Sequence, residues 1–381
     1  MVNTTSPFRF FICALIGITS WGLYTPISHA QDKPQTSENN EETVSVIDKG
    51  KEENKENKDN ALTASAYAIP TPIPARNLNP FIQIFGIPIM ETATLVPVGK
   101  SQLTIHYDVV NNAIQGKTGP ETLIIDGETY RTSIIWRKGL SNSLEVGIEI
   151  PFISHSSGLF DQHITGWHDI FQLSNSDRDA RPDNSLSYYY YREYDVAYNI
   201  SCCNSDNPEI GDIRFFASQP IIRSTTKPIS LTASIKAPTG NENKLKGSGD
   251  VDFTLALNSS NSERYQQWKI TTFGQLGLIM IGQNHRDGLA LANLRREAAL
   301  FAGYGASWRY LPKLDLKAQF NVHTSMYNSE ISALGTFSSM LTVGLTSHLN
   351  KRLTLDLHLG ENLFTDTVPD VMINSAIAWR Y

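Results

Sequence analysis

Apolar and polar residues alternate along many short segments of the chain, and the last segment shows the pattern clearly. In residues 371–381, Val371, Ile373, Ile377 and Trp379 share one parity, and from Asn374 onward the other parity is small or polar. Since successive side chains of a strand point to opposite faces, this segment predicts a strand with one apolar and one polar face. About ten residues of such alternation suit a tilted strand that crosses a bilayer between lipid and a wet lumen.

Eleven further segments alternate in the same way, so the sequence predicts twelve strands. The most regular is 353–359, where leucines hold the odd positions against Thr354, Asp356 and His358. The others are 103–109, 130–137, 144–152, 213–217, 229–237, 251–257, 268–280, 298–310, 314–322 and 341–349. After residue 30 no apolar run approaches the ~18–20 residues of a membrane helix. Because an open sheet cannot satisfy its backbone in lipid, we expect an all-β fold, a closed transmembrane antiparallel β-barrel.

Connection lengths and aromatic residues support this strand count. If the C-terminus is periplasmic, every second connection is a periplasmic turn, and these are short: 138–143, 220–228, 258–267, 311–312 and 350–352. The others are longer and rich in Gly or Asn, as extracellular loops are. Aromatic residues with outward parity gather at the predicted periplasmic strand ends: Trp136, Trp268, Trp308, Tyr310, Trp379 and Tyr381. Membrane interfaces attract Trp and Tyr, whereas a soluble sandwich has no reason to place Trp at one level.

Three segments precede the barrel, which we assign to residues 99–381. Residues 1–30 combine a basic start, an apolar core and a small-x-small end, the pattern of a signal peptide for export. Residues 31–68 are rich in Glu, Lys and Asn, so we expect a disordered acidic periplasmic tether, either a spacer or a contact arm. Residues 69–98 are apolar and Pro-rich, which excludes a central strand. This segment is either a plug in the lumen or packs at the periplasmic rim.

One connection is much longer than the rest. The strand parity makes residues 154–209 a single extracellular loop, although residues 188–198 alternate as a strand would. Apolar residues recur there at helical spacing behind Asp161, which predicts a short helix that lies over the mouth or enters the lumen: Phe160, Ile164, Trp167 and Phe171. For Cys202 and Cys203, a vicinal disulfide, a bond to a partner and free thiols all stay open.

Charges of both signs occupy inward positions of the predicted strands. The lumen-lining candidates are Arg131, Arg137, Glu145, Glu149, Asp212, Arg214, Asp356 and Arg380, and further inward charges are Asp252, Lys269, Arg309, Asp315 and Lys317. A turn at 139–142 places Arg137 opposite or diagonal to Glu145, and Arg131 near Glu149. Such charges form either a selective constriction or pairs that stiffen a filled lumen. The plug and lid candidates are Asn79, Pro80, Phe81, Phe85, Trp167 and His168.

Enzymatic and metal chemistry have little support in the sequence. Residues 154–157, Ser-His-Ser-Ser, invite comparison with a rim hydrolase, but adjacent loop residues seldom reach the ~2.6–3.2 Å that a nucleophile and its base need. The histidines and aspartates between residues 163 and 183 match no calcium-binding spacing. We therefore expect no catalytic residues, no metal and no cofactor. The formal charge of −6 does not suggest nucleic acid as a partner.

Four motifs carry a resemblance to a known family. They are Asn79-Pro80-Phe81-x-Gln83-Ile84-Phe85-Gly86-x-Pro88, Asp126–Arg131, Ile153–Gly158 and Gly166–Asp169. They resemble those of an uncharacterised family of proteobacterial outer-membrane proteins, the domain of unknown function 3187, over roughly residues 77–381. The resemblance implies an outer-membrane barrel and brings no catalytic residues. The family is also distantly similar to barrels associated with export or uptake of aromatic and fatty compounds.

These expectations combine into one hypothesis. We expect an outer-membrane β-barrel, in contact with outer-membrane lipid and with the barrel-insertion machinery, that is a narrow or gated channel for small molecules. The alternative is a structural or surface-contact protein of the same membrane, and a rim hydrolase is a third. The identity of the solute stays open.

Overall fold

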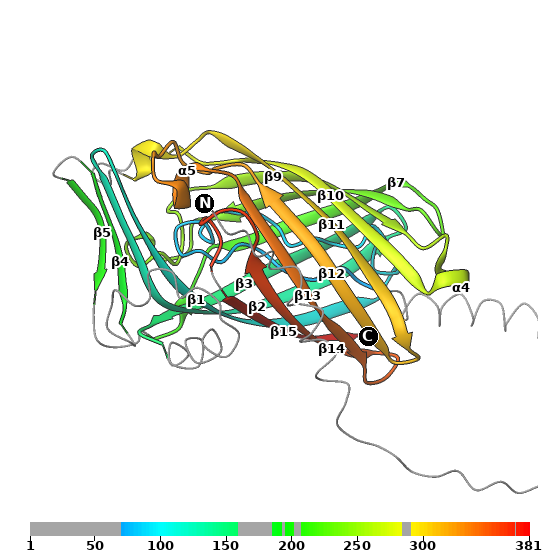
Figure 1. Ribbon diagram of the computed structural model, residues 1–381. Coiled ribbons are helices and arrows are strands. Elements are labelled where there is room, and N and C mark those ends of the chain that lie inside the picture. The colour runs from blue at the N-terminus through cyan, green and yellow to red at the C-terminus, as the bar shows by residue number, and fades with distance from the viewer. Residues whose placement is uncertain (1–69, 159–184, 193–194, 202–206, 284–290, 370) are drawn as a thin grey trace, which may run out of the picture. The chain divides into compact units, whose positions relative to one another are not determined.

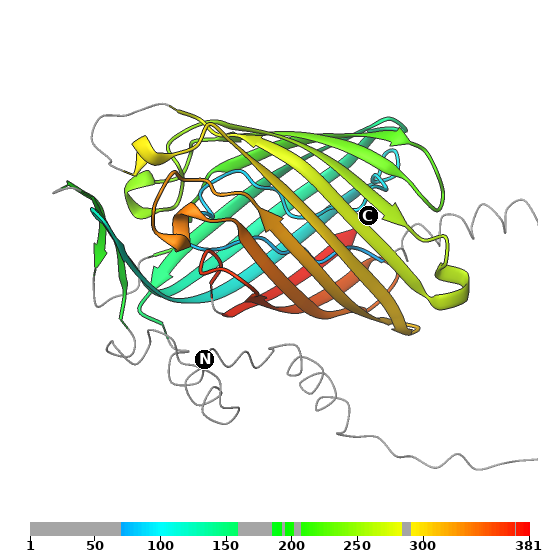
Figure 2. The same ribbon diagram turned by 45° about the horizontal axis from the view of Figure 1, so that its top comes forward.

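Twelve strands close into an antiparallel barrel (Figures 1 and 2). The computed structural model describes residues 70–158, 185–192, 195–201, 207–283, 291–369 and 371–381. Each barrel strand pairs with the next one along the chain, and the last pairs with the first, so the predicted closed barrel is confirmed. The strands are β1 (Ser101–Thr118), β2 (Glu121–Ser141), β3 (Leu144–Ser156), β7 (Ile213–Ile222), β8 (Ile229–Ala237), β9 (Asp252–Asn261), β10 (Ile270–Met280), β11 (Ala298–Leu311), β12 (Leu314–His323), β13 (Ser338–His348), β14 (Leu353–Asn362) and β15 (Val371–Arg380).

The two ends of the barrel differ in their connections. At the end where β1 begins and β15 finishes, called the short-turn end here, the connections are 142–143, 223–228, 262–269, 312–313 and 349–352. The opposite, long-loop end carries the longer connections, which include η3 (Glu242–Lys244), η4 (Ala292–Leu294) and α5 (Ser332–Gly335). Among the described residues a further helix, α4 (Tyr265–Trp268), lies in a short-turn connection. None of the helices in the described ranges is long and apolar enough to cross a membrane.

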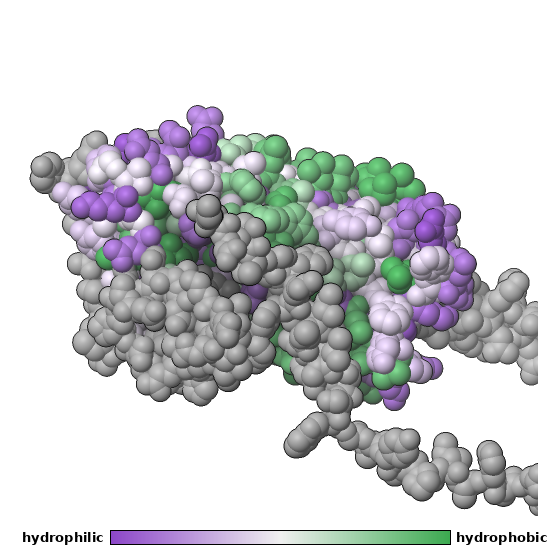
Figure 3. Space-filling model, viewed as in Figure 1, coloured by the Kyte–Doolittle hydropathy of each residue, from purple (hydrophilic) through white to green (hydrophobic). Residues whose placement is uncertain are grey.

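The alternation seen in the sequence separates the outer face of the barrel from its lumen. In β14, Leu355, Leu357 and Leu359 are 37–49% exposed, whereas Asp356 and His358 between them are buried. Figure 3 shows the resulting apolar outer surface between hydrophilic ends. At the short-turn end the aromatic rings lie on the outer face in pairs, with 5.2 Å between the centroids of Trp308 and Tyr310 and 4.6 Å between those of Trp379 and Tyr381.

The outer face allows a direct test of lipid contact. Leu357 lies at the middle of β14 and is 49% exposed. We expect Leu357→Arg to lower the free energy of unfolding by ~2–4 kcal/mol, because the charge meets the middle of the hydrocarbon layer. Unfolding by denaturant in lipid vesicles measures this change. Leu349→Arg is the control, because Leu349 lies at the rim in a short turn and the same substitution should cost only ~0–1 kcal/mol there.

The structure corrects the expected loop between the first two strands. Residues 111–118 of β1 pair with residues 121–128 of β2 as a continuous hairpin around Gly119, which adopts a positive φ of 53°. The base of this extension is covered on both faces, since residues 110–113 and 125–129 are all buried, whereas residues 115–118 towards its tip are largely exposed and carry no large apolar side chain. Burial on both faces removes the alternation by which the other strands were found. The hairpin therefore escaped a prediction that relied on one lipid-facing side.

The long loop also contains strands. Of residues 188–198, assigned to a loop, 188–192 fall in β4 (Ser187–Arg192) and 195–198 fall in β5 (Asp195–Ser201), and β4 pairs with the hairpin extension of β2 (Figure 1). The short β6 (Glu209–Ile210) pairs with β3. Because β4 and β5 lie outside the barrel wall and β6 continues β7 along the same side of β3, the expected number of crossings still holds. Strand parity predicts the number of membrane crossings, and it gives no information about strands beyond the membrane.

A smaller correction concerns the start of β10. Trp268 and Lys269 were assigned to a strand, with Lys269 facing the lumen. Trp268 instead ends α4, and Lys269 follows it in a left-handed conformation, exposed to solvent and over the ring of Tyr265. The expected signal peptide, the tether, the loop helix with Trp167 and His168, and the cysteine pair Cys202 and Cys203 lie outside the described residues.

Candidate functional site

Residues 70–98, which we call the lumen segment, lie inside the barrel (Figure 2). The part of the lumen segment before its apex, called the first arm here, runs alongside β12 and beyond its end. Four contacts join residues separated by 246 positions in each case: Lys317 Nζ to Thr71 Oγ1 (3.1 Å), Gln319 Nε2 to Ile73 O (2.9 Å), Asn77 Nδ2 to His323 Nε2 (3.1 Å) and Tyr327 Oη to Phe81 O (2.8 Å). A constant separation means that the arm is extended and parallel to β12, rising from the short-turn end to the long-loop end.

The arm ends in a helical turn near the long-loop end. The carbonyl of Asn79 accepts hydrogen bonds from the amides of Ile82 and Gln83, both at 2.8 Å. The side chain of Asn79 accepts from the amide of Phe81 at 3.0 Å, as an N-cap residue does. Pro80 follows at the first position of the turn, where its missing N–H costs nothing. The Asn79-Pro80-Phe81 motif thus builds the apex of the lumen segment.

The second arm returns along β9 and reaches the barrel wall. The amide of Gly86 donates to Asp252 Oδ2 (3.0 Å), and the amide of Ala93 donates to Ser260 Oγ (3.0 Å) at the other end of the same strand. The amide of Val96 then donates to Glu145 Oε2 at 2.6 Å. A Cβ at Gly139 of β2 would lie 2.2 Å from the Val96 carbonyl oxygen, so only glycine lets the chain pass there.

Six of the eight lumen-lining candidates gather on one side of the lumen, and five of them meet the lumen segment in one cluster. Glu149 receives three guanidiniums: Arg76 at 2.6 Å, Arg214 at 3.0 Å and Arg131 at 3.3 Å. Arg137 lies 2.8 Å from Glu145 and also pairs with Glu91. The expected neighbourhood of Arg137 with Glu145 and of Arg131 with Glu149 is therefore present, and all these side chains are largely buried.

The remaining candidates lie apart from this cluster. Asp212 precedes β7 and pairs with Lys236 at 2.7 Å. Lys236 also lies 3.0 Å from Asp252 and donates to the carbonyl of Ile84 in the lumen segment (2.9 Å). Across the lumen, Asp356 pairs with Lys317 at 3.2 Å. At the rim, Arg380 donates to Gln102 at 3.3 Å.

Arg76 and Glu91 are site residues that the sequence analysis missed. They are the only charged residues between positions 69 and 98. A charge in an apolar segment that is buried needs a partner of opposite sign, because an unpaired buried charge is very costly. That signal was available in the sequence and would have pointed to charged partners on the wall.

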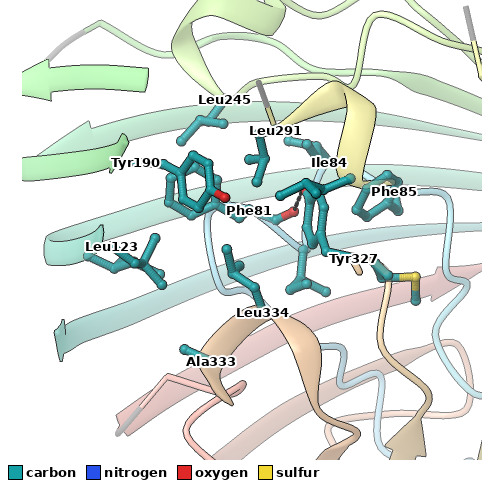
Figure 4. Close-up of a cluster of buried hydrophobic side chains, with 14 of the residues drawn as sticks. Phe81, Ile84, Phe85, Leu123, Tyr190, Leu245, Leu291, Tyr327, Ala333 and Leu334 are labelled. Carbon is teal, nitrogen blue, oxygen red and sulfur yellow. Dashed lines mark hydrogen bonds between the residues drawn. The ribbon is translucent and has the colours of Figure 1, made fainter. Parts of the chain in front are cut away.

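An apolar cluster closes the lumen at the long-loop end (Figure 4). Phe81, Ile84 and Phe85 from the apex pack there against side chains from three loops and from β2 and β4, including Leu123, Tyr190, Leu245, Leu291, Tyr327 and Leu334. The ring centroids of Phe85 and Tyr327 are 5.5 Å apart at an angle of 60°. Of the plug candidates, Asn79, Pro80, Phe81 and Phe85 thus lie at the apex, buried beneath the loops.

A cavity of about 140 Å³ lies at the short-turn end. Both arms of the lumen segment and the wall line it, with Thr71, Glu91 and Val96 on one side and Arg137, Glu145, Asp356 and Arg380 on the other. The lumen is therefore partly hollow at one end, where charged and apolar side chains line it together, and sealed by apolar side chains at the other.

The Ser-His motif of β3 has a structural setting rather than a catalytic one. His155 is fully buried, with Nδ1 2.9 Å from Thr129 Oγ1 and its ring edge-on to Tyr188. Ser154 and Ser156 lie on the opposite face of the strand. Burial raises the pKa of Tyr188, whose hydroxyl lies 3.1 Å from Thr129. Nowhere in the described ranges do three or more His, Cys, Asp or Glu side chains form a group that could hold a metal ion.

Residues 59–381 match the model of a family described as "Protein of unknown function (DUF3187)". No curated protein matches the chain. Among solved structures, the COG4313 outer membrane channel from Pseudomonas putida F1 is 12% identical with a TM-score of 0.48, covering 75% of this chain and 97% of that one. The KdgM porin is 7% identical (TM-score 0.38; 73% and 98%), and the P. putida toluene transporter TodX is 10% identical (0.36; 74% and 90%). Similarity at this level leaves the function to be argued from the chain's own residues.

Proposed function

Since the chain belongs to the DUF3187 family, whose description assigns no activity, we propose a function from the geometry of its lumen. The protein is an outer-membrane channel for small molecules, and the lumen segment is the plug that closes it. Its short turns and C-terminus face the periplasm, and its long loops face the outside, as in bacterial barrels of this kind. The apolar belt contacts lipid.

The observation that carries this proposal is the nature of the contact between plug and wall. Along the barrel wall the plug is held by side-chain hydrogen bonds, ion pairs and two small apolar clusters, and one bridge, Val98 to Gly139, joins its backbone to a described strand by ladder pairing. Water can replace the hydrogen bonds among these contacts at modest cost, since a hydrogen bond contributes a net ~0.5–1.5 kcal/mol. A barrel that served only as a rigid support would gain more from an apolar filling.

The cavity at the short-turn end indicates which end of the lumen is open and which end is closed. It leaves a space with charged groups in its lining between the two arms of the plug on the periplasmic side. The apolar apex cluster forms the barrier on the outside. A solute therefore passes when the apex separates from the loops and the arms move apart.

A surface-contact function is the second candidate, and one feature favours it. The β1–β2 extension carries β4 and β5 as a small sheet outside the barrel wall. Tyr189 and Tyr191 lie on one face of β4 with parallel rings, at 6.5 Å between centroids. Such a sheet offers a partner aromatic area without any need for transport.

A reversible cross-link between plug and wall separates these two functions. The hydroxyls of Thr92 and Ser260 are 3.2 Å apart, so cysteines at both positions are placed to form a disulfide. In a background with Cys202 and Cys203 replaced by serine, we expect liposomes with the reduced double variant to take up glycine, arabinose or acetate. Oxidation should stop the uptake, and a reductant should restore it.

The two single-cysteine variants are the controls. Neither can form the disulfide, so the oxidant should not change the solute uptake of either. Uptake that continues after complete cross-linking would show that the plug is not the gate. No uptake of any of the three solutes in the reduced state would contradict the channel and favour the surface-contact function.

A further inference from the structure

A second, smaller cavity lies between the plug and the wall, beside the charge cluster. Its volume is about 20 Å³, enough for one particle of the size of a water molecule. Positive head groups outnumber carboxylates in its lining by five to two: Arg76, Arg131, Arg214, Lys236 and Lys246 against Glu149 and Asp212. Plug residues 83–87 form the rest of the lining.

Gln83 and Arg214 bring unused hydrogen-bonding groups to this cavity. Gln83 is 5% exposed, and neither its amide nitrogen nor its amide oxygen has a hydrogen-bond partner in the described part of the chain. Arg214 is 3% exposed, and its Nη1 and Nη2 make no hydrogen bond within that same part, although Nη2 lies 3.0 Å from Glu149. Because a buried polar group without a partner costs ~1–3 kcal/mol, a ligand that accepts hydrogen bonds here is stabilising.

The neighbouring carboxylates are engaged elsewhere, which determines the charge of the ligand. Glu91 is 3.9 Å from Arg214 because it pairs with Arg137. Asp108 lies opposite Arg131 in the strand register and accepts a hydrogen bond from Asn374 at 2.9 Å. Asp252 and Glu209 compensate Lys236 and Lys246 from outside the cavity lining.

Donors therefore dominate at this point, since a guanidinium has five N–H groups and no acceptor. Three guanidiniums share the two oxygens of Glu149, and the amide nitrogen of Gln83 adds further donors. The lining repels a cation. A neutral molecule such as water would leave the positive charge of the lining uncompensated.

We propose that the cavity between Gln83 and Arg214 binds one small monovalent anion of about the size of chloride. Arg131 and Arg214 hold it from the wall, and Arg76 and Gln83 hold it from the plug. The anion thus ties the plug to the wall. This site is additional to channel activity and does not depend on it.

The test compares two sodium salts at equal ionic strength. Gluconate is far larger than the cavity, so chloride alone fits. For purified full-length protein in detergent, we expect the midpoint of thermal unfolding to be higher in chloride than in gluconate, by about 2–4 °C. Arg214→Gln should abolish the difference, because Arg76 and Arg131 keep Glu149 paired while the anion loses its main donor. Lys227→Gln, at an exposed ion pair on the rim, should keep the full difference.

Gln83→Glu provides a second, independent readout on the plug side. A carboxylate at this position takes the place of the anion, so the variant should unfold at the same midpoint in both salts, no lower than the wild type in chloride. This result decides the matter if Arg214→Gln fails to fold. Equal midpoints for the wild type in the two salts, or a chloride effect that survives both substitutions, overturns the proposal. No flux is measured, so failure of the channel proposal leaves this outcome unchanged.

Discussion

Replacing Glu149 by Gln is expected to lower the free energy of unfolding by ~3–5 kcal/mol, the usual cost of removing one partner of a buried ion pair. Glu149 is 1% exposed and lies within 3.3 Å of Arg76, Arg131 and Arg214. The amide keeps the shape of the side chain and removes its charge. Three buried guanidiniums then lose the carboxylate that they share.

Denaturant unfolding of the reconstituted protein measures this loss, and Glu263→Gln is the matched control. Glu263 pairs with Lys227 at 2.6 Å, with side chains 58% and 54% exposed. Exposed pairs contribute only ~0–1 kcal/mol, because water screens them and their side chains lose freedom when they meet. If the two variants lost the same stability, the cluster around Glu149 would have no special weight.

Phe81→Ala is expected to release the apex of the plug. Phe81 is completely buried in the apolar cluster, and truncation of such a ring costs ~3–5 kcal/mol. Since ~1.4 kcal/mol changes an equilibrium tenfold, the open fraction of the channel should rise by at least about two orders of magnitude. Single-channel recording in planar bilayers would show this as frequent openings of a channel that opens only rarely in the wild type.

Phe364→Ala is the control for this effect, because Phe364 belongs to a loop at the same end and is 74% exposed. Its truncation should leave the openings as rare as in the wild type. A Phe81 variant that stays closed while its barrel remains folded would mean that the apex cluster is not the barrier.

The sequence predicted the barrel wall well because lipid imposes a simple rule on it. Wherever one face of a strand meets lipid, as for Leu355, Leu357 and Leu359, alternate positions must be apolar, and the pattern is visible over a few residues. The rule ends where the membrane ends. Hence the β1–β2 extension and the β4–β5 hairpin, whose surroundings differ from lipid, were assigned to loops.

The path of the plug could not be predicted in the same way. Its partners lie 246 residues away on β12 and 166–168 residues away on β9, and no local pattern encodes such distances. The wall charges were found because parity places them inside. Their additional partners Arg76 and Glu91 were missed, because a Pro-rich segment has no parity from which to infer the direction of its side chains.

The hydrogen bonds between Ser101 and Tyr381 carry a consequence for biogenesis. The amide of each residue donates to the carbonyl of the other, at 2.8 and 2.9 Å, where the first barrel strand meets the last. The stretch just ahead of Ser101 makes its contacts with strands that are synthesised much later. This stretch can form those contacts only after the later strands have been synthesised. We therefore expect it to be enclosed when the first and last strands pair, so that the lumen segment folds in the same step as the barrel closes.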